Sequence, residues 1–182
     1  MSTVTVKDVL DFWFDKANQP YWFEKNDKFD NTLKEKFLAT LEQAKQGELN
    51  NWRTTTQGRL AEIIVLDQFS RNIYRDTPDA FAQDGMALVL SQEIIQQVDF
   101  KTLSLDERNF ALMPMMHSES ANIHAKAVPL FEQYASEQTL DFEYKHKAMI
   151  DKYGRYPQRN AILGRKSSKK EIEFLNLPNS SF

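Results

Sequence analysis

The sequence has no cysteine, little glycine and no long apolar run, and each shortage excludes a class of protein. Without cysteine among its 182 residues, the chain can form no disulfide, thiolate nucleophile or cysteine-ligated zinc site. Its five glycines are widely spaced and make neither the GxGxxG pattern nor a P-loop for phosphate. No GxSxG marks a serine nucleophile elbow. The purest apolar run, residues 63–66, is far shorter than a membrane span.

The charge balance argues against a polyanionic partner. A formal net charge of -3 and a pI near 5.7 give the chain no overall positive field, so we expect it not to bind nucleic acid. Small anions are not excluded by this balance. The first residues, MSTVTVKDVLDFWF, place an acidic residue where a signal peptide needs an apolar run. We therefore expect a cytoplasmic protein that does not enter the membrane.

Helical periodicity recurs along almost the whole chain, whereas no segment alternates apolar and polar residues for the length of a half-buried strand. The pattern predicts an all-α fold of about seven or eight helices. The connections are short, which favours stacked antiparallel helix pairs. With 41% apolar residues the chain can fill one core, so we expect a single domain over residues 1–182.

Local signals place several helix ends. Asp27 is a candidate N-cap for a helix with one apolar stripe, which Gly47 ends. Gly154 is the expected end of the helix through FEYKHKAMIDKY. Pro114 and Pro129 fall inside helical stretches and predict a kink or a break there. Capping boxes are predicted at residues 54–57, 104–107 and 168–171, and two competing helix starts at residues 77–78 and 84–85.

Arginine is concentrated in two short stretches, DQFSRNIYR and GRYPQRN. These stretches and the GR at residues 164–165 hold five of the eight arginines, and neither stretch contains lysine. A guanidinium group binds carboxylate or phosphate through two parallel hydrogen bonds, which the point charge of lysine does not reproduce. The choice of arginine therefore indicates defined geometry.

The DQFSRNIYR stretch continues a helix that is apolar nearly all round. An apolar stripe through Leu60 and Ile64 runs directly into Asp67 and Arg71 by helical spacing. A helix of this kind lies centrally in a fold, so both charges are expected to be at least partly buried and paired. Their i, i+4 spacing lets them pair with each other.

Two interpretations of the arginines remain open. In the first, they clamp helices together by pairing with acidic residues of the protein itself. The candidate partners are Glu62, Asp67, Asp84, Glu119 and Asp151. In the second, they converge on a pocket for an anionic ligand. This set comprises Arg71, Arg155 and Arg159, together with Asn72 and Asn160.

The three histidines offer no convincing metal site. His117 and Glu119, at i, i+2, face different sides of a continuing helix, and His117 and His124 lie about 10.5 Å apart along one. We predict neither a metal nor a cofactor. If His117 or His146 lies beside the arginines, it becomes the best available general acid or base.

Long motifs along the chain resemble the bacterial family called domain of unknown function 924. They are VLDFWF, LDQFSRNIYRDTPDAFAQD, ERNFALMPMMHSE, HKAMIDKYGRYPQRNAILGR and the tail LPNSSF. The resemblance covers almost the whole chain and implies a TPR-like architecture of αα-hairpins. It implies no established activity. Because the motif residues are largely polar, aromatic and arginine-rich, the resemblance strengthens the pocket interpretation.

We therefore expect a polar pocket where the DQFSRNIYR helix, the HSE turn and the GRYPQRN loop meet. The predicted ligand-binding residues are Asp67, Gln68, Arg71, Asn72, Arg155, Arg159 and Asn160, and the candidate catalytic residues are His117, Glu119 and His146. The expected ligand is a small carboxylate or phosphate, and the sequence leaves open whether any reaction follows. The alternative is a scaffold that binds a peptide or protein partner through aromatic residues such as Trp13, Trp22 and Trp52, with the arginines as clamps.

Overall fold

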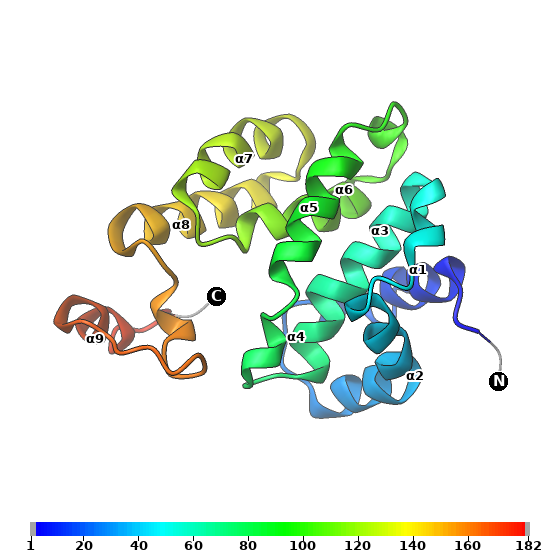
Figure 1. Ribbon diagram of the computed structural model, residues 1–182. Coiled ribbons are helices and arrows are strands. Elements are labelled where there is room, and N and C mark those ends of the chain that lie inside the picture. The colour runs from blue at the N-terminus through cyan, green and yellow to red at the C-terminus, as the bar shows by residue number, and fades with distance from the viewer. Residues whose placement is uncertain (1–2, 181–182) are drawn as a thin grey trace.

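A computed structural model describes residues 3–180, and every regular element within them is a helix. The all-α expectation is confirmed. Counting α3, the π-helical turn after it and α4 as one continuous helix, the described residues form eight helices. The bounds are α1 (Val6–Phe14), α2 (Asp27–Lys45), α3 (Thr56–Ile64), α4 (Ser70–Ile73), α5 (Asp84–Ile95), α6 (Leu105–Met116), α7 (Ala121–Tyr134), α8 (Glu137–Tyr153) and α9 (Lys169–Leu175) (Figure 1).

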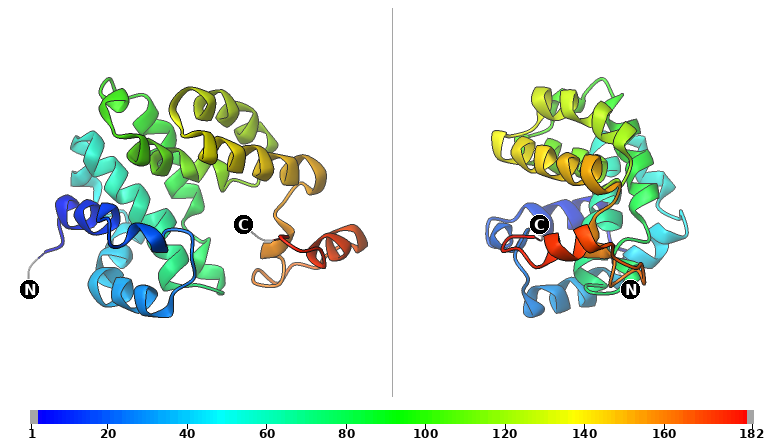
Figure 2. Two further views of the ribbon diagram at one scale, coloured as in Figure 1. Left: turned by 180° about the vertical axis from the view of Figure 1, so that it is seen from behind. Right: turned by 90° about the vertical axis from the view of Figure 1, so that its left-hand side faces the viewer.

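Helices that follow each other in the chain pack against each other from α5 to α8, and α3 contacts α1, α5 and α6. The front and back views place α1 and α2 at one end of the molecule and α7, α8 and α9 at the other (Figures 1 and 2). Consecutive packing is what stacked helix pairs require. The TPR-like label stays a prediction.

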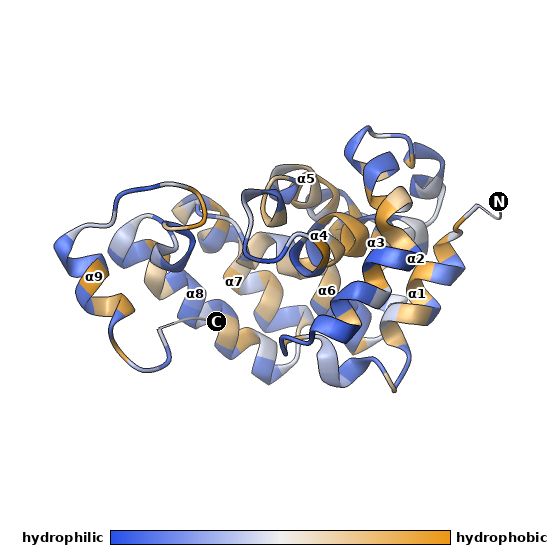
Figure 3. Ribbon diagram, turned by 90° about the horizontal axis from the view of Figure 1, so that it is seen from below, coloured by the Kyte–Doolittle hydropathy of each residue, from blue (hydrophilic) through white to orange (hydrophobic). Residues whose placement is uncertain are grey.

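Helix α3 lies at the centre of the core. Every side chain from residue 60 to residue 66 is fully buried, and Figure 3 shows hydrophobic residues on α3 beside hydrophilic ones. The indole of Trp13 from α1 packs edge-on against Phe69 and Phe110, at centroid distances of 5.7 and 5.4 Å. Burying an apolar side chain stabilises the fold by about 1.5–3 kcal/mol. The core therefore fixes α3 firmly just before the polar residues that follow it.

A π-helical turn, Val65–Phe69, joins α3 to α4 where the sequence pattern predicts an uninterrupted α-helix. In a π-helical turn the N–H groups bond to the carbonyl five residues back, so the turn holds one residue more than an α-helical turn. All five side chains of this turn are buried. Asp67 and Gln68 are therefore both held inside the protein, and turns of this kind are frequent at functional sites.

Two predicted helix starts are wrong by one residue. The cap of α2 is Asn26, whose Oδ1 accepts the N–H of Phe29 at 2.9 Å. The cap of α3 is Thr55, whose Oγ1 accepts the N–H of Gly58 at 2.9 Å, so the predicted box at residues 54–57 is not formed. Glycine is required at residue 58 because a Cβ there would lie 1.7 Å from the carbonyl oxygen of Trp52. The predicted boxes that begin at Ser104 and Ser168 are confirmed.

The remaining helix signals have mixed outcomes. Gly154 ends α8 in the left-handed conformation with φ 71°, as predicted. Pro114 and Pro129 lie inside α6 and α7, so neither marks a break. Residues 84–85 open α5, whereas Pro78 opens only a short 3₁₀ turn. Within residues 3–180, no helix combines the length and the apolar character needed to cross a membrane.

Candidate functional site

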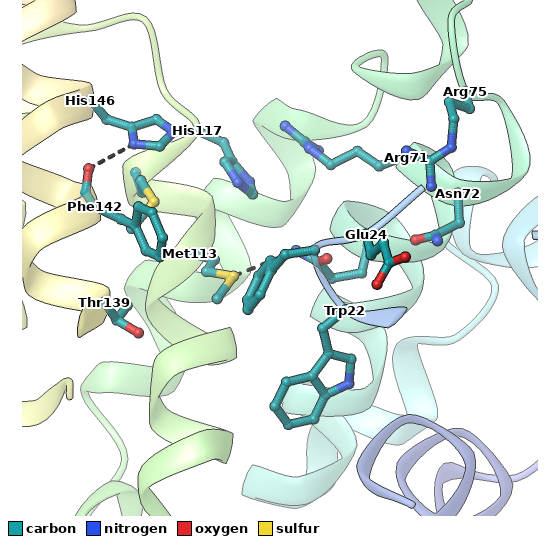
Figure 4. A pocket seen from close by; sticks show the side chains of 13 residues that line it. Trp22, Glu24, Arg71, Asn72, Arg75, Met113, His117, Thr139, Phe142 and His146 are labelled. Carbon is teal, nitrogen blue, oxygen red and sulfur yellow. Dashed lines mark hydrogen bonds between the residues drawn. The ribbon is translucent and has the colours of Figure 1, made fainter. Parts of the chain in front are cut away.

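A pocket of about 240 Å³ opens between α6, α8, the segment of residues 22–24 and the segment of residues 68–75 that includes α4 (Figure 4). It has one polar wall and one apolar wall. The polar wall includes Gln68, Arg71, Asn72, Arg75, His117 and His146. The apolar wall includes Trp22, Phe23, Met113, Met116 and Phe142. Five of the ten side chains predicted for the site, and both candidate catalytic histidines among them, thus line one pocket.

Asp67 is the buried anchor of the polar wall. Its Oδ1 accepts hydrogen bonds from Nδ1 of His117 at 2.7 Å and from Nη1 of Arg71 at 3.0 Å, and its Oδ2 accepts one from Gln68 at 2.8 Å. Burial works against the charge of this carboxyl, but His117 and Arg71 together hold its pKa below the usual value. Asp67 therefore stays ionised at neutral pH.

His117 follows the last residue of α6 and reaches the pocket beside Arg71 (Figure 4). An ionised carboxylate can only accept, so the contact with Asp67 places a hydrogen on Nδ1 of the imidazole. The other ring nitrogen, Nε2, has no hydrogen-bond partner among residues 3–180. In the neutral ring this nitrogen carries the basic lone pair. The side chain keeps 14% of its surface exposed and also lines a second cavity of about 330 Å³.

Arg71 is held by two carboxylates at once. Besides Asp67, it donates from Nη1 and Nη2 to the two oxygens of Asp84, at 2.7 and 2.9 Å. Burial opposes its charge, but both carboxylates raise its pKa above the usual value, so the guanidinium remains a fixed cation. Its Nε has no hydrogen-bond partner among the described residues. Arg71 is thus both a clamp and a wall of the pocket.

His146 lies on α8 with its ring centroid 6.5 Å from that of His117. Its Nδ1 donates to the carbonyl of Phe142 at 2.7 Å, because a carbonyl oxygen can only accept. Burial, assisted by the neighbouring His117, His124 and Arg159, lowers its pKa to about 3. This imidazole is therefore neutral at neutral pH.

Arg159 and Glu119 lie at the second cavity rather than the first. Arg159 donates to the carbonyl of His117 at 3.0 Å and approaches Asp84 at 3.4 Å, while its guanidinium stacks on Phe81 and Tyr156. Glu119 accepts two bonds from Arg165, at 2.8 and 2.9 Å. These contacts occupy both side chains with other parts of the protein.

Arg155 and Asn160 line neither cavity. Arg155 makes a bidentate pair with Glu171 of α9, at 2.8 and 2.9 Å. Asn160 donates to Ser167 at 3.0 Å and accepts from Arg165 at 2.9 Å. Arg155 and Asn160 therefore fasten the C-terminal segment that includes α9.

The predicted acidic partners are largely found. Asp67 and Asp84 pair with Arg71, and Glu119 pairs with Arg165. Glu62 pairs with Arg53, which lies outside the two arginine stretches, at 2.7 Å. Asp151 instead pairs with Lys147. The clamp interpretation thus describes most of these arginines.

The sequence interpretation missed Arg75 and the apolar wall. Arg75 donates from Nε and Nη2 to Asp30, at 2.7 and 3.1 Å, while its Nη1 has no hydrogen-bond partner in the described part of the chain. Its place in the DQFSRNIYR stretch was the available signal. Met113 and Met116 are buried and also line the pocket.

The Arg155–Glu171 clamp predicts a loss of stability in acid. Arg155 and the N-terminal backbone of α9 lower the pKa of Glu171 from 4.5 to about 2. Because the folded pKa lies below the unfolded one, this contribution is complete above about pH 4.5 and is lost as the pH falls toward 2. We expect the free energy of unfolding of Glu171→Gln to lie below that of the wild type at pH 7 and to meet it near pH 2. A gap that stays constant across urea titrations at these pH values would contradict the assignment.

Comparison with known proteins gives a family and one solved structure. The model of a family described as "Bacterial protein of unknown function (DUF924)" matches residues 9–179. The "Structure of Protein of Unknown Function ATU0120 from Agrobacterium tumefaciens" is 31% identical, with a TM-score of 0.88, and the match covers 94% of this chain and 96% of that one. The search of curated proteins gave no match. Neither description states an activity or a ligand.

Proposed function

We propose that this chain, which belongs to the DUF924 family of bacterial proteins of unknown function, binds a small ligand that carries a carboxylate or phosphate beside an apolar group. The observation that carries the proposal is the two-sided pocket, with guanidinium groups on one wall and aromatic and methionine side chains on the other. A mostly apolar concavity with a few converging polar groups is the usual form of a small-molecule site.

The polar wall retains donors for an anion. The carboxylates of the protein do not bind Nη1 of Arg75 or Nε of Arg71, as far as the described residues extend. An anion at these N–H groups would gain charge-assisted hydrogen bonds without displacing the existing clamps.

The apolar wall suits an aromatic or aliphatic body. Trp22, Phe142 and the two methionines supply a polarizable surface, and methionine adapts readily to ligand shape. Phe23 keeps 70% of its surface exposed while lining the pocket, which places it at the mouth. At about 240 Å³, the cavity falls slightly below the usual range of drug-sized pockets, so the ligand is a small metabolite.

The scaffold alternative has its own support. Arg155, Arg165 and Arg53 are occupied by carboxylates of the protein, as the clamp interpretation requires. Phe23 would then be one exposed anchor for a peptide, since buried aromatic anchors carry much of the energy of protein interfaces.

The test compares two arginines with similar internal partners. Arg75→Met and Arg155→Met each break one bidentate pair with a carboxylate, but only Arg75 lines the pocket. Melting temperatures are measured with benzoate, phenyl phosphate, acetate and inorganic phosphate. Saturation at 100 times Kd adds about 2.7 kcal/mol, which shifts Tm by roughly 2–4 °C per kcal/mol.

We expect benzoate or phenyl phosphate to raise the Tm of the wild type and of Arg155→Met equally, and to leave Arg75→Met unchanged. Acetate and inorganic phosphate, which lack the apolar group, should shift Tm much less. If no probe shifts the wild type, the small-anion proposal fails. A protein partner whose binding is lost in Phe23→Ser would then favour the scaffold.

A further inference from the structure

We propose that the pocket is also catalytic and hydrolyses a small carboxylic ester that carries an anionic group. This inference rests on the proposed function, because the anion-binding wall positions the substrate. His117 would be the general base that activates water, Arg71 the donor to the developing oxyanion, and Asp67 the residue that positions both.

The first argument is the state of His117. Its Nδ1–H donates to an ionised and fully buried carboxylate at 2.7 Å, which fixes both the tautomer and the ring orientation. Nε2 has no hydrogen-bond partner among residues 3–180, the side chain lines the pocket, and in the neutral ring this nitrogen carries the basic lone pair. An imidazole positioned in this way by a carboxylate is a recurrent general base.

The second argument is the position of Arg71. Its Nη1 and the Nδ1 of His117 bind the same oxygen of Asp67, at 3.0 and 2.7 Å, so the guanidinium and the imidazole are adjacent. The pairs with Asp67 and Asp84 hold the guanidinium in place. A cation already held beside the base can stabilise negative charge that develops on a carbonyl oxygen without having to reorganise.

The third argument is the shape of the helix that supplies these groups. Asp67 and Gln68 lie in the π-helical turn, and Arg71 is the second residue after it. Interruptions of this kind occur often at functional sites. Burying a carboxylate in the middle of a core helix is costly unless the carboxylate is fully paired. An apolar side chain at residue 67 would fill the core without this cost, so packing alone does not account for the aspartate.

Water is the nucleophile that this base can activate. The chain has no cysteine. Among the described residues that line the pocket, Thr139 has the one aliphatic hydroxyl group, and that oxygen already accepts from Ser136 at 2.9 Å. The expected reaction is therefore direct hydrolysis without a covalent intermediate.

The steps balance as follows. Nε2 of His117 takes a proton from water as the hydroxide oxygen forms a bond to the ester carbon, and the carbonyl electron pair moves to the oxygen beside Arg71. The tetrahedral intermediate then reforms the carbonyl and breaks the bond to the alkoxy oxygen. The imidazolium of His117 gives its proton to that leaving group, so acid and alcohol are the products.

The expected rate enhancement favours carboxylic esters over phosphate esters as substrates. A general base contributes roughly 10²–10⁴-fold and one oxyanion donor roughly 10²–10³-fold. Their product, about 10⁴–10⁷-fold, lies at the low end of enzymatic rate enhancements. Hydrolysis of phosphate monoesters requires accelerations of up to about 10²¹-fold, which these groups cannot supply.

The experiment uses 3-acetoxybenzoate, which combines a carboxylate, a ring and an ester, and follows release of 3-hydroxybenzoate by chromatography. Phenyl acetate serves as the neutral ester, and free imidazole at matched concentration gives the rate of an imidazole that no protein positions. The variants are His117→Gln and Asp67→Asn, with Arg155→Met as the control outside the pocket. Each is assayed well below its own Tm.

We expect wild type and Arg155→Met to exceed imidazole and to prefer 3-acetoxybenzoate. His117→Gln should lose roughly 10²–10⁴-fold in kcat. Asp67→Asn should lower kcat while leaving KM within about twofold, a split that simple loosening of the fold would not give. A wild-type rate no greater than that of imidazole, or a rate indifferent to His117→Gln, overturns catalysis. The melting assay then tests the proposed function separately: a Tm shift with benzoate would keep the binding proposal even if catalysis is excluded.

Discussion

Asp67→Ala is expected to lower the free energy of unfolding by about 3–5 kcal/mol, the range for breaking a buried ion pair by removing one partner. The carboxylate is completely buried and accepts from His117, Arg71 and Gln68. Its removal leaves those donors without their shared acceptor and opens a void in the π-helical turn. Urea unfolding monitored by circular dichroism measures the effect.

A matched exposed carboxylate provides the control. Asp141 pairs with Lys145 at i, i+4, as Asp67 does with Arg71, but its side chain is 62% exposed. Asp141→Ala should change stability little, because water replaces the lost contact. Similar losses for the two alanine variants would show that the Asp67 network does not stabilise the fold.

Glu143→Met is expected to have a comparable effect, about 3–5 kcal/mol, at a second buried pair. Glu143 and His124 have no exposed side-chain surface, and Oε1 of Glu143 lies 2.7 Å from Nδ1 of His124. Nε2 of the same imidazole donates to the carbonyl of Ser118 at 2.7 Å. Removal of the carboxylate therefore leaves Nδ1 without a partner in the interior between α7 and α8.

The double variant His124→Phe with Glu143→Met separates the net contribution of the pair to stability from the cost of removing only one partner. Buried pairs replaced on both sides by apolar residues are often neutral or stabilising. Oε2 of Glu143 has no hydrogen-bond partner in the described part of the chain, so this pair is incompletely satisfied. We expect the double variant to regain most of the loss in a thermodynamic cycle. A double variant as unstable as the single one would mean that the stability loss of Glu143→Met comes from altered packing and not from the unpaired histidine.

Contacts close in sequence were largely predictable. The pair of Asp67 and Arg71 follows from i, i+4 spacing, and burial follows from the apolar helix before it. The all-α class and two of the three capping boxes also came from local periodicity and capping chemistry. These features depend on residues within one or two helical turns, which is the range that periodicity reports.

Contacts across the fold were not predictable in the same way. His117 meets Asp67 across 50 positions of the chain, and Arg159 meets Asp84 across 75. No single-chain pattern says which of several acids an arginine will reach, so Arg155 was assigned to the pocket but binds Glu171. Phe142 was not singled out in the sequence, and Trp22 was predicted only for the peptide-binding alternative. Only the packing of α8 opposite residues 22–24 brings both side chains to one pocket.

The π-helical turn makes the site depend on a count of residues as well as on their kinds. Each residue advances an α-helix by about 100°, so deleting one residue from Val65–Phe69 would let α3 run into α4 as a regular helix, with α4 rotated by that angle relative to the rest of the fold. Arg71 would turn away from Asp84, and α3 would keep its core face. The polar wall is therefore a property of register, and an insertion or deletion could create or abolish it with every site residue still present.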